Sequence, residues 1–208
     1  MVTNLSTAVV TYLFNIILLK MAGETGVVAI TVVLYGQFLF IALYLGFGIG
    51  VAPVFSYNYG AGNREMLERI YRISIKFVIG SSIIITLAGL LGAPFIAEVF
   101  VKKGAEAYEL TRRGCFLFAF NYLFAGINIL ASGIFTALSD GKTSALISFL
   151  RTFGFILASL LILPKVIGLD GVWLAIPLAE FLTLLLSLNR LFAFFGTGMK
   201  RKKIVSES

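Results

Sequence analysis

The chain has 208 residues, of which 59% are hydrophobic and only 13% are charged, whereas an ordinary soluble domain carries about 25% charged residues. This composition excludes a soluble globular domain and indicates a protein that lies in a lipid bilayer. The lack of histidine and the single cysteine, Cys115, exclude histidine-based catalysis, a Cys/His zinc site and an intrachain disulfide. We therefore expect neither an enzyme nor a cofactor or metal site. The net charge of +7 comes from helix ends and one tail, so we expect no nucleic-acid partner.

Six apolar stretches follow one another along the chain, and each is long enough to cross a bilayer as a helix. We expect helices at about 3–19, 27–57, 70–92, 113–138, 144–163 and 171–192, which together form one lobe over residues 1–192. The stretches are too long for barrel strands and lack their alternation, so the predicted fold class is an all-α, six-helix membrane bundle. Between the third and fourth stretches, Phe95, Val99 and Tyr108 among charged residues predict a short surface helix.

The basic residues favour an orientation with both termini in the cytoplasm. In this orientation ten basic residues lie on the inner side and six on the outer side, and positively charged segments are retained in the cytoplasm. Four of the ten belong to the cluster 200–203 in the basic tail 193–208. The expected location is the cell membrane, with several crossings and with membrane lipid as a partner.

Glycines and prolines in two of the stretches predict flexible or closely packed points. Gly46 and Gly50 form a small-xxx-small pair that permits close helix approach, and Pro53 cannot donate to the carbonyl four residues earlier. Both a tight helix crossing and a functional hinge fit this pattern. Pro177 frees the carbonyl of Trp173, which predicts a bent and locally polar midplane in the last helix.

Two charged residues interrupt the apolar stretches, Arg151 in the fifth and Glu180 in the sixth. Their distances from the intervening turn place them at depths that differ by only ~5 Å. A lone charge near the bilayer centre costs at least ~2.5–3.5 kcal/mol, so we expect the two to pair across the hairpin. The pair either fixes the register of the hairpin, or serves a site where Glu180 exchanges protons or contacts a cation and Arg151 tunes it.

Uncharged polar residues recur at helical spacing within several stretches and thus share faces. The candidates are Asn15 in the first stretch, Gln37 and Tyr44 in the second, and Asn121 and Asn128 in the fourth. An unsatisfied amide in hydrocarbon is costly, so such faces seek other helices or water. These residues either make interhelical hydrogen bonds or form the polar wall of a substrate cleft.

Three segments resemble multidrug and toxic compound extrusion (MATE) transporters. They are Tyr57–Asn63 (YNYGAGN), Gly133–Lys142 (GIFTALSDGK), and Ser148–Arg151 (SFLR) followed by Gly168–Glu180 (GLDGVWLAIPLAE). The last pattern is similar to the final hairpin of the prokaryotic branch that contains staphylococcal-type multidrug exporters. The resemblance covers nearly the whole chain, but only half of the usual twelve-helix architecture.

The resemblance implies the C-terminal half of a cation-coupled antiporter, driven by H⁺ or Na⁺, that exports organic and often cationic compounds by alternating access. Its implied partners are small organic substrates and an N-terminal six-helix half, which shares the substrate cleft. Other members carry a coupling acid in the first or seventh helix, whereas the first stretch here has none and leaves Glu180 as the candidate.

Two alternatives stay open. A related lipid-linked oligosaccharide flippase is expected to need several cationic residues in its cavity, of which only Arg151 is available. The other alternative is a non-transporting membrane subunit that requires a separate N-terminal half.

Overall fold

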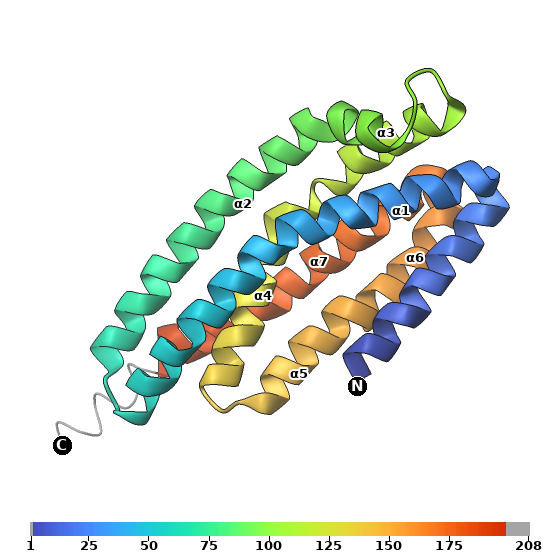
Figure 1. Cartoon of the computed structure of the whole chain (residues 1–208). Helices are drawn as coiled ribbons and strands as arrows, with labels where there is room; N and C mark the ends of the chain where they lie inside the picture. Colours follow the sequence, from blue (N-terminus) through green and yellow to red (C-terminus); the bar gives the residue numbers. More distant parts are fainter. Residues whose placement is uncertain (1, 199–208) are drawn as a thin grey trace.

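The computed structural model describes residues 2–198, and the side chains of residues 8–196. These residues form a bundle of helices (Figure 1). The α-helices are α1 (Val2–Gly60), α2 (Arg64–Phe100), α3 (Glu106–Phe118), α4 (Asn121–Ala137), α5 (Gly141–Phe149), α6 (Phe155–Ile167) and α7 (Leu169–Phe192). Two π-helical segments complete the set, η1 (Leu150–Gly154) and η2 (Ala193–Gly198). The expected cluster at residues 200–203 lies outside the described residues.

The helix α1 consists of two arms that meet at Gly23. This residue has φ 63° and ψ −154°, and these angles lie outside the helical region. A positive φ is readily adopted only by glycine, so the chain reverses there within one residue and the second arm runs back beside the first (Figure 1). The connection expected around residues 20–26 is thus much tighter than the sequence suggests.

The long apolar helices support six crossings of a membrane. Four continuous helical segments within the described residues are long and apolar enough to cross, and the pair α3–α4, bent by 47°, makes a fifth. Because the first of these segments contains both arms of α1, the total is six. The fold class expected from the sequence is therefore confirmed: the chain is an all-α membrane bundle.

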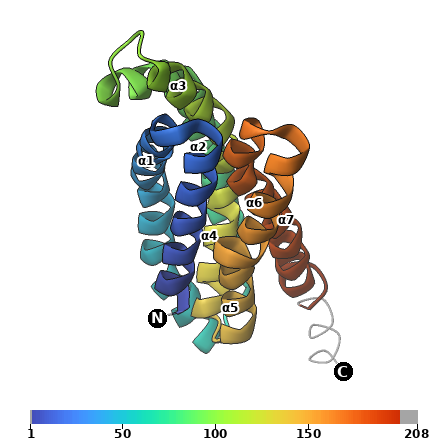
Figure 2. The ribbon, with the colours of Figure 1, turned by 90° about the vertical axis from the view of Figure 1, so that its right-hand side faces the viewer.

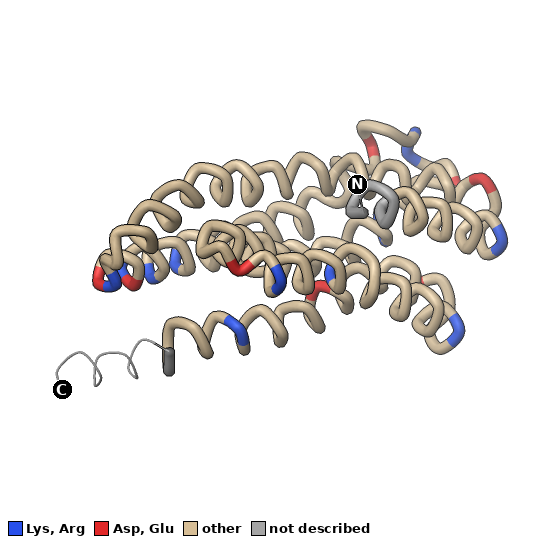
Figure 3. The backbone as a smooth tube through the Cα atoms, turned by 90° about the horizontal axis from the view of Figure 1, so that it is seen from below, with Lys and Arg blue, Asp and Glu red and all other residues tan. Residues whose placement is uncertain are grey.

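The turns gather at two ends of the bundle (Figures 1 and 2). The Gly62 end contains the turns at 61–63 and 138–140 and the segment η2. The Gly168 end contains Gly23, the segment 101–105 and Gly168. Lys, Arg, Asp and Glu lie mainly in turns and near helix ends (Figure 3). This distribution suits helices whose central parts lie in hydrocarbon.

Close packing depends on glycines that the sequence does not single out. A Cβ at Gly126 in α4 would lie 2.8 Å from Ser82 Oγ, Tyr44 Cε1 and Val78 Cγ1. α1, α2 and α4 can therefore cross at this point only because residue 126 has no side chain. Large apolar side chains such as Leu91 and Ile84 on α2 remain exposed, at 80% and 69%, as expected for a surface in contact with lipid.

Several predicted boundaries need correction. The short surface helix expected around Phe95, Val99 and Tyr108 does not form: the first two residues belong to the end of α2, and Tyr108 belongs to α3. Both helices continue past the apolar core, since polar residues do not end a helix by themselves. The fourth stretch is broken between α3 and α4, and the fifth contains the π-turn η1.

The expected tight crossing at Gly46 and Gly50 is not formed with any other helix among the described residues. Both residues are exposed, and a Cβ at either position would have nothing within 4 Å. The helix continues through Pro53 to Gly60, and its only non-helical residue is Gly23. Within the described residues, this face of α1 is unpacked. A hinge at Gly46, Gly50 or Pro53 stays a prediction, as does one at Pro177, which lies within the continuous helix α7.

Candidate coupling site and cavities

The two charged residues expected to pair do form an ion pair in the middle of the bundle. Arg151 Nε donates to Glu180 Oε1 at 2.6 Å. The Glu180 side chain is 3% exposed and that of Arg151 17% exposed. Asn128 Nδ2 donates to Glu180 Oε2 at 2.7 Å and to the Glu180 carbonyl at 2.8 Å. Each carboxylate oxygen therefore accepts one hydrogen bond, which is how a buried charge is made tolerable.

Three elements position this triad of Arg151, Glu180 and Asn128. Arg151 lies in the π-turn η1, where the N–H of Phe155 bonds to the carbonyl of Leu150, five residues earlier. Such single π-turns inside α-helices are frequent at functional sites, because they re-aim the side chains they carry. Glu180 follows Pro177 in α7, and Asn128 lies near the middle of α4, which packs beside α7.

A cavity of about 140 Å³ adjoins the triad. Its polar lining residues are Thr11 from the first arm of α1, Gln37 from the second arm, Thr152 from η1, and the charged pair itself. Apolar side chains complete the wall: Val10, Phe14, Leu34, Ile156 and Ile176. Of the uncharged cleft candidates, Gln37 is the one that lines this cavity, and it does so next to the ion pair.

The other cleft candidates lie in the helix packing. Asn15 Nδ2 donates to the carbonyl of Thr11 in its own helix at 2.9 Å. Tyr44 is 2% exposed and donates to the carbonyl of Tyr122 at 3.1 Å. Its ring lies where Gly126 leaves space. These contacts are the local and interhelical hydrogen bonds of the first interpretation, and a role of either residue in a substrate cleft stays a prediction.

The two asparagines of α4, Asn121 and Asn128, are both fully buried within the described residues. Asn128 serves Glu180, as described above. Asn121 Nδ2 and Oδ1 have no hydrogen-bond partner among the described residues, and neither has Asn128 Oδ1. Of the two, Asn128 is the one whose side chain bonds to α7, and their role in a substrate cleft stays a prediction.

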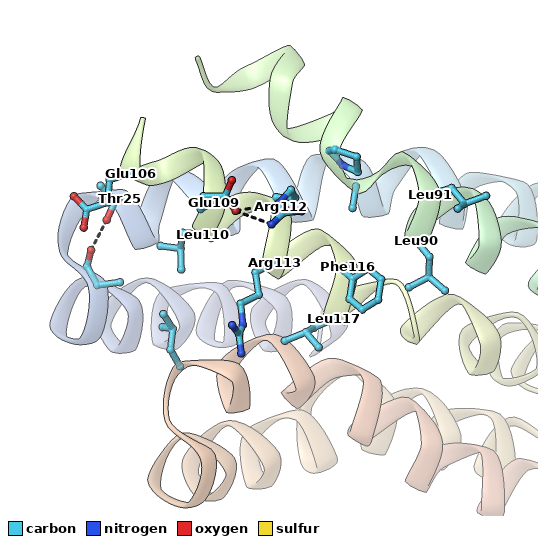
Figure 4. A pocket seen from close by; sticks show the side chains of 14 residues that line it. Thr25, Leu90, Leu91, Glu106, Glu109, Leu110, Arg112, Arg113, Phe116 and Leu117 are labelled. Atoms are coloured by element: carbon cyan, nitrogen blue, oxygen red, sulfur yellow. Dashed lines mark hydrogen bonds and ion pairs between the residues drawn. The ribbon is translucent and has the colours of Figure 1, made fainter. Parts of the chain in front are cut away.

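A second, larger cavity of about 920 Å³ opens at the Gly168 end (Figure 4). Leu90 and Leu91 of α2, and Phe116 and Leu117 of α3, form its apolar wall. Both arginines of its lining are paired: Arg112 bonds to Glu109 at 2.7 Å, and Arg113 bonds to Asp170. Glu106 also lines the cavity and forms no ion pair with the described residues. Sequence reasoning missed this cavity, because residues of four helices, α1, α2, α3 and α7, line it and no local motif marks a space formed by distant segments.

Comparison with known protein families identifies the family of this chain. Residues 1–160 match the model of the MatE family. The chain belongs to this family. The resemblance found in the sequence is thereby confirmed at the level of the family, whereas the staphylococcal-type branch stays a prediction. No significant match is found among curated protein sequences.

Solved structures of MATE proteins share the fold of this chain. An outward-facing multidrug resistance MATE family transporter of the MOP superfamily is 20% identical, with a TM-score of 0.82. An inward-facing transporter of the same description is 21% identical, with a TM-score of 0.83. A third, the Vibrio cholerae MATE transporter VcmN in the bent form, is 19% identical, with a TM-score of 0.81. Identities this low establish the fold alone.

The chain spans slightly less than half the length of these MATE proteins. The alignments cover 100%, 99% and 97% of this chain but 45%, 46% and 44% of the outward-facing, inward-facing and Vibrio cholerae proteins. This chain therefore corresponds to one lobe of a larger architecture, as its six crossings indicate.

Proposed function

We propose that this chain is the C-terminal lobe of a cation-coupled multidrug antiporter, and that the complete transporter exports organic, often cationic, compounds in exchange for H⁺ or Na⁺. The observation that carries the proposal is the buried triad around Glu180. An acid in the middle of a membrane helix is costly to keep and is by default a functional candidate. It lies one turn after Pro177, near the middle of α7, and beside a small cavity lined by polar and apolar side chains. Transporters commonly place coupling sites near the bilayer midplane.

In this mechanism Glu180 alternates between two states. As a carboxylate it accepts hydrogen bonds from Arg151 and Asn128 and holds α7 against η1 and α4. Once a proton or another cation neutralises its charge, the ion pair with Arg151 weakens and the contact between η1 and α7 loosens. The adjoining cavity gives water and ions a place next to the carboxylate. The substrate cleft itself is shared with the N-terminal six-helix half.

The similarity to both conformations supports alternating access by movement of whole lobes. The chain matches an outward-facing and an inward-facing MATE transporter almost equally well, with TM-scores of 0.82 and 0.83. A lobe that fits both states does not need to refold between them. The exposed face around Gly46 and Gly50 of α1 is a candidate surface for the other lobe.

The ion pairs favour an orientation with the Gly62 end in the cytoplasm. At the Gly168 end, Lys103, Arg112 and Arg113 each pair with an acid, and three exposed lysines form no ion pair with the described residues: Lys20, Lys102 and Lys165. At the Gly62 end six exposed basic residues form no ion pair with the described residues: Arg64, Arg69, Arg72, Lys76, Lys142 and Arg190. Unpaired basic residues near the membrane surface are attracted to the anionic cytoplasmic leaflet. Both termini are then cytoplasmic.

The two alternative functions fit less well. A flippase for lipid-linked oligosaccharides needs several cationic groups in its cavity, whereas among the described residues Arg151 is the one cationic residue that lines the cavity beside the triad. A non-transporting subunit gives no reason for a buried, fully hydrogen-bonded acid beside a polar cavity. We therefore prefer the antiporter.

The test is ethidium accumulation in cells that express the complete transporter. We expect wild-type protein to lower accumulation and Glu180→Gln to bring it close to the level of cells without the transporter. Glu98→Gln is the matched control, because Glu98 is an ion-paired acid of which 41% is exposed. Full efflux by Glu180→Gln at normal expression would remove Glu180 from the mechanism.

A further inference from the structure

The guanidinium of Arg151 has more donors than this chain uses. An arginine side chain carries five N–H groups. The Nε group donates to Glu180 Oε1 at 2.6 Å. Within the described residues, the two terminal amino groups, with four N–H, have no hydrogen-bond partner. Since Arg151 lines the 140 Å³ cavity and its side chain is 17% exposed, these donors are available to a ligand there.

Other donors line the same cavity. Thr11 Oγ1 and the side-chain amide of Gln37 make no hydrogen bond with the described residues, and they belong to the two arms of α1. The hydroxyl of Thr152 is already bonded to the carbonyl of Ser148, at 2.8 Å. The carboxylate of Glu180 is the charged acceptor of the cavity, and each of its oxygens already accepts a bond. The free hydrogen-bonding capacity of the cavity is therefore rich in donors.

The charge balance of the site depends on Glu180. When Glu180 is ionised, the pair is neutral. When the charge of Glu180 is neutralised, the pair carries a net positive charge on Arg151. This charge is mostly buried and no longer has an anionic partner, which is unfavourable in a low-dielectric environment. A small anion in the cavity would restore neutrality and use the free amino groups. The volume of 140 Å³ is enough for such an ion, since one water occupies about 30 Å³.

We propose that the cavity bounded by Arg151, Gln37 and Thr11 binds a small monovalent anion, either a free halide or a carboxylate group of a substrate. The anion competes with Glu180 for the guanidinium and binds most tightly when Glu180 carries no charge. Anion binding itself requires only the geometry of the cavity. It rests on the proposed function only in the expectation that Glu180 becomes neutral during transport.

Binding of radioactive chloride to the purified chain in detergent tests this, with gluconate as the counter-ion. Glu180→Gln removes the competing charge and keeps the shape, so we expect at least tenfold tighter binding than in wild type. The double variant R151Q/E180Q, whose folding is checked by size-exclusion chromatography, should bind at least a hundredfold more weakly than E180Q. Thr11→Val leaves the ion pair intact and should weaken binding about threefold to tenfold. Thr31→Val is its matched control, since Thr31 is exposed and bonds to its own helix.

Competition identifies the source of the anion. Displacement of chloride by benzoate but not by benzamide shows that the site also accepts carboxylates of aromatic compounds. Retention of chloride against both restricts the site to halides. Chloride binding that is no tighter in E180Q than in wild type, or no weaker in R151Q/E180Q than in E180Q, would overturn the proposal. Because the assay measures no transport, tighter binding in E180Q together with normal efflux would reject the coupling role of Glu180 and leave the anion site standing.

Discussion

Loss of one partner of the Arg151–Glu180 pair should destabilise the bundle strongly, whereas loss of both should not. The perturbation is a double-mutant cycle with Glu180→Leu, Arg151→Met and the double variant. Removing one partner of a buried ion pair typically costs about 3–5 kcal/mol, because it leaves an uncompensated charge. Replacing both partners by apolar side chains of similar volume is often neutral.

The burial of the residue left behind sets the expected free-energy cost of each substitution. Glu180→Leu leaves Arg151, which is 17% exposed and borders a cavity that can admit water, so we expect the lower limit of about 3 kcal/mol. Since 1.4 kcal/mol corresponds to a factor of ten, the equilibrium between folded and unfolded chain changes roughly 150-fold. Arg151→Met leaves Glu180, only 3% exposed, and should cost about 4 kcal/mol. We expect the double variant to lie within about 1 kcal/mol of wild type.

Reversible unfolding in mixed detergent micelles, followed by circular dichroism, provides the free energies. Glu109→Leu is the control, because it breaks an exposed ion pair with Arg112 and should cost less than about 1 kcal/mol. With about 3 and about 4 kcal/mol for the single variants and at most about 1 kcal/mol for the double variant, the coupling energy of the buried pair should be about 6 kcal/mol or more. Additive effects of the two single variants would show that the two residues are not coupled and would refute this reasoning.

Three further predictions concern packing, capping and topology. Gly126→Ala should destabilise the fold by about 1–3 kcal/mol in the same unfolding assay, because the added Cβ would lie 2.8 Å from atoms of three side chains. The control Gly133→Ala should be neutral or slightly stabilising, because a Cβ there would have nothing within 4 Å. Asp140→Ala removes the cap that accepts from the N–H of Thr143 and should cost about 1 kcal/mol; equal stability would refute the cap. Hydrogen bonds from Thr143 lower the pKa of the Asp140 carboxyl in the folded chain. The stabilisation that ionised Asp140 provides is therefore fully present above the ordinary pKa of an aspartate and is lost as the pH falls through the lowered pKa of the folded chain. A series of unfolding curves at different pH values would detect this loss. Cysteines at positions 63 and 103 should react with an impermeant maleimide from the cytoplasmic and the external face respectively, and labelling from one common face would contradict the six crossings.

The apolar stretches and the ion pair could be predicted from the sequence because both follow from the cost of polar groups in lipid. A run of apolar residues has one stable form in hydrocarbon, the helix. A charge inside such a run needs a partner, and Arg151 and Glu180 lie at similar depths on consecutive helices. The same reasoning could not place Asn128, because the pattern shows which residues share a face but not which helix that face meets.

The breaks and the packing contacts could not be predicted because they depend on tertiary structure. The π-turn at η1 and the bend between α3 and α4 carry no proline or clear turn signal at the break itself. Gly126 leaves the space in which three helices cross, whereas Gly46 and Gly50 have the familiar spacing and no neighbour among the described residues. Spacing therefore indicates that close approach is possible, while the partner decides whether it occurs.

The most direct test of the central claim is transport in proteoliposomes with an imposed cation gradient. We predict that the 208-residue chain reconstituted alone does not exchange ethidium for H⁺ or Na⁺, and that reconstitution together with a six-helix N-terminal half restores the exchange. Gradient-driven ethidium transport by this chain as a monomer would contradict the account.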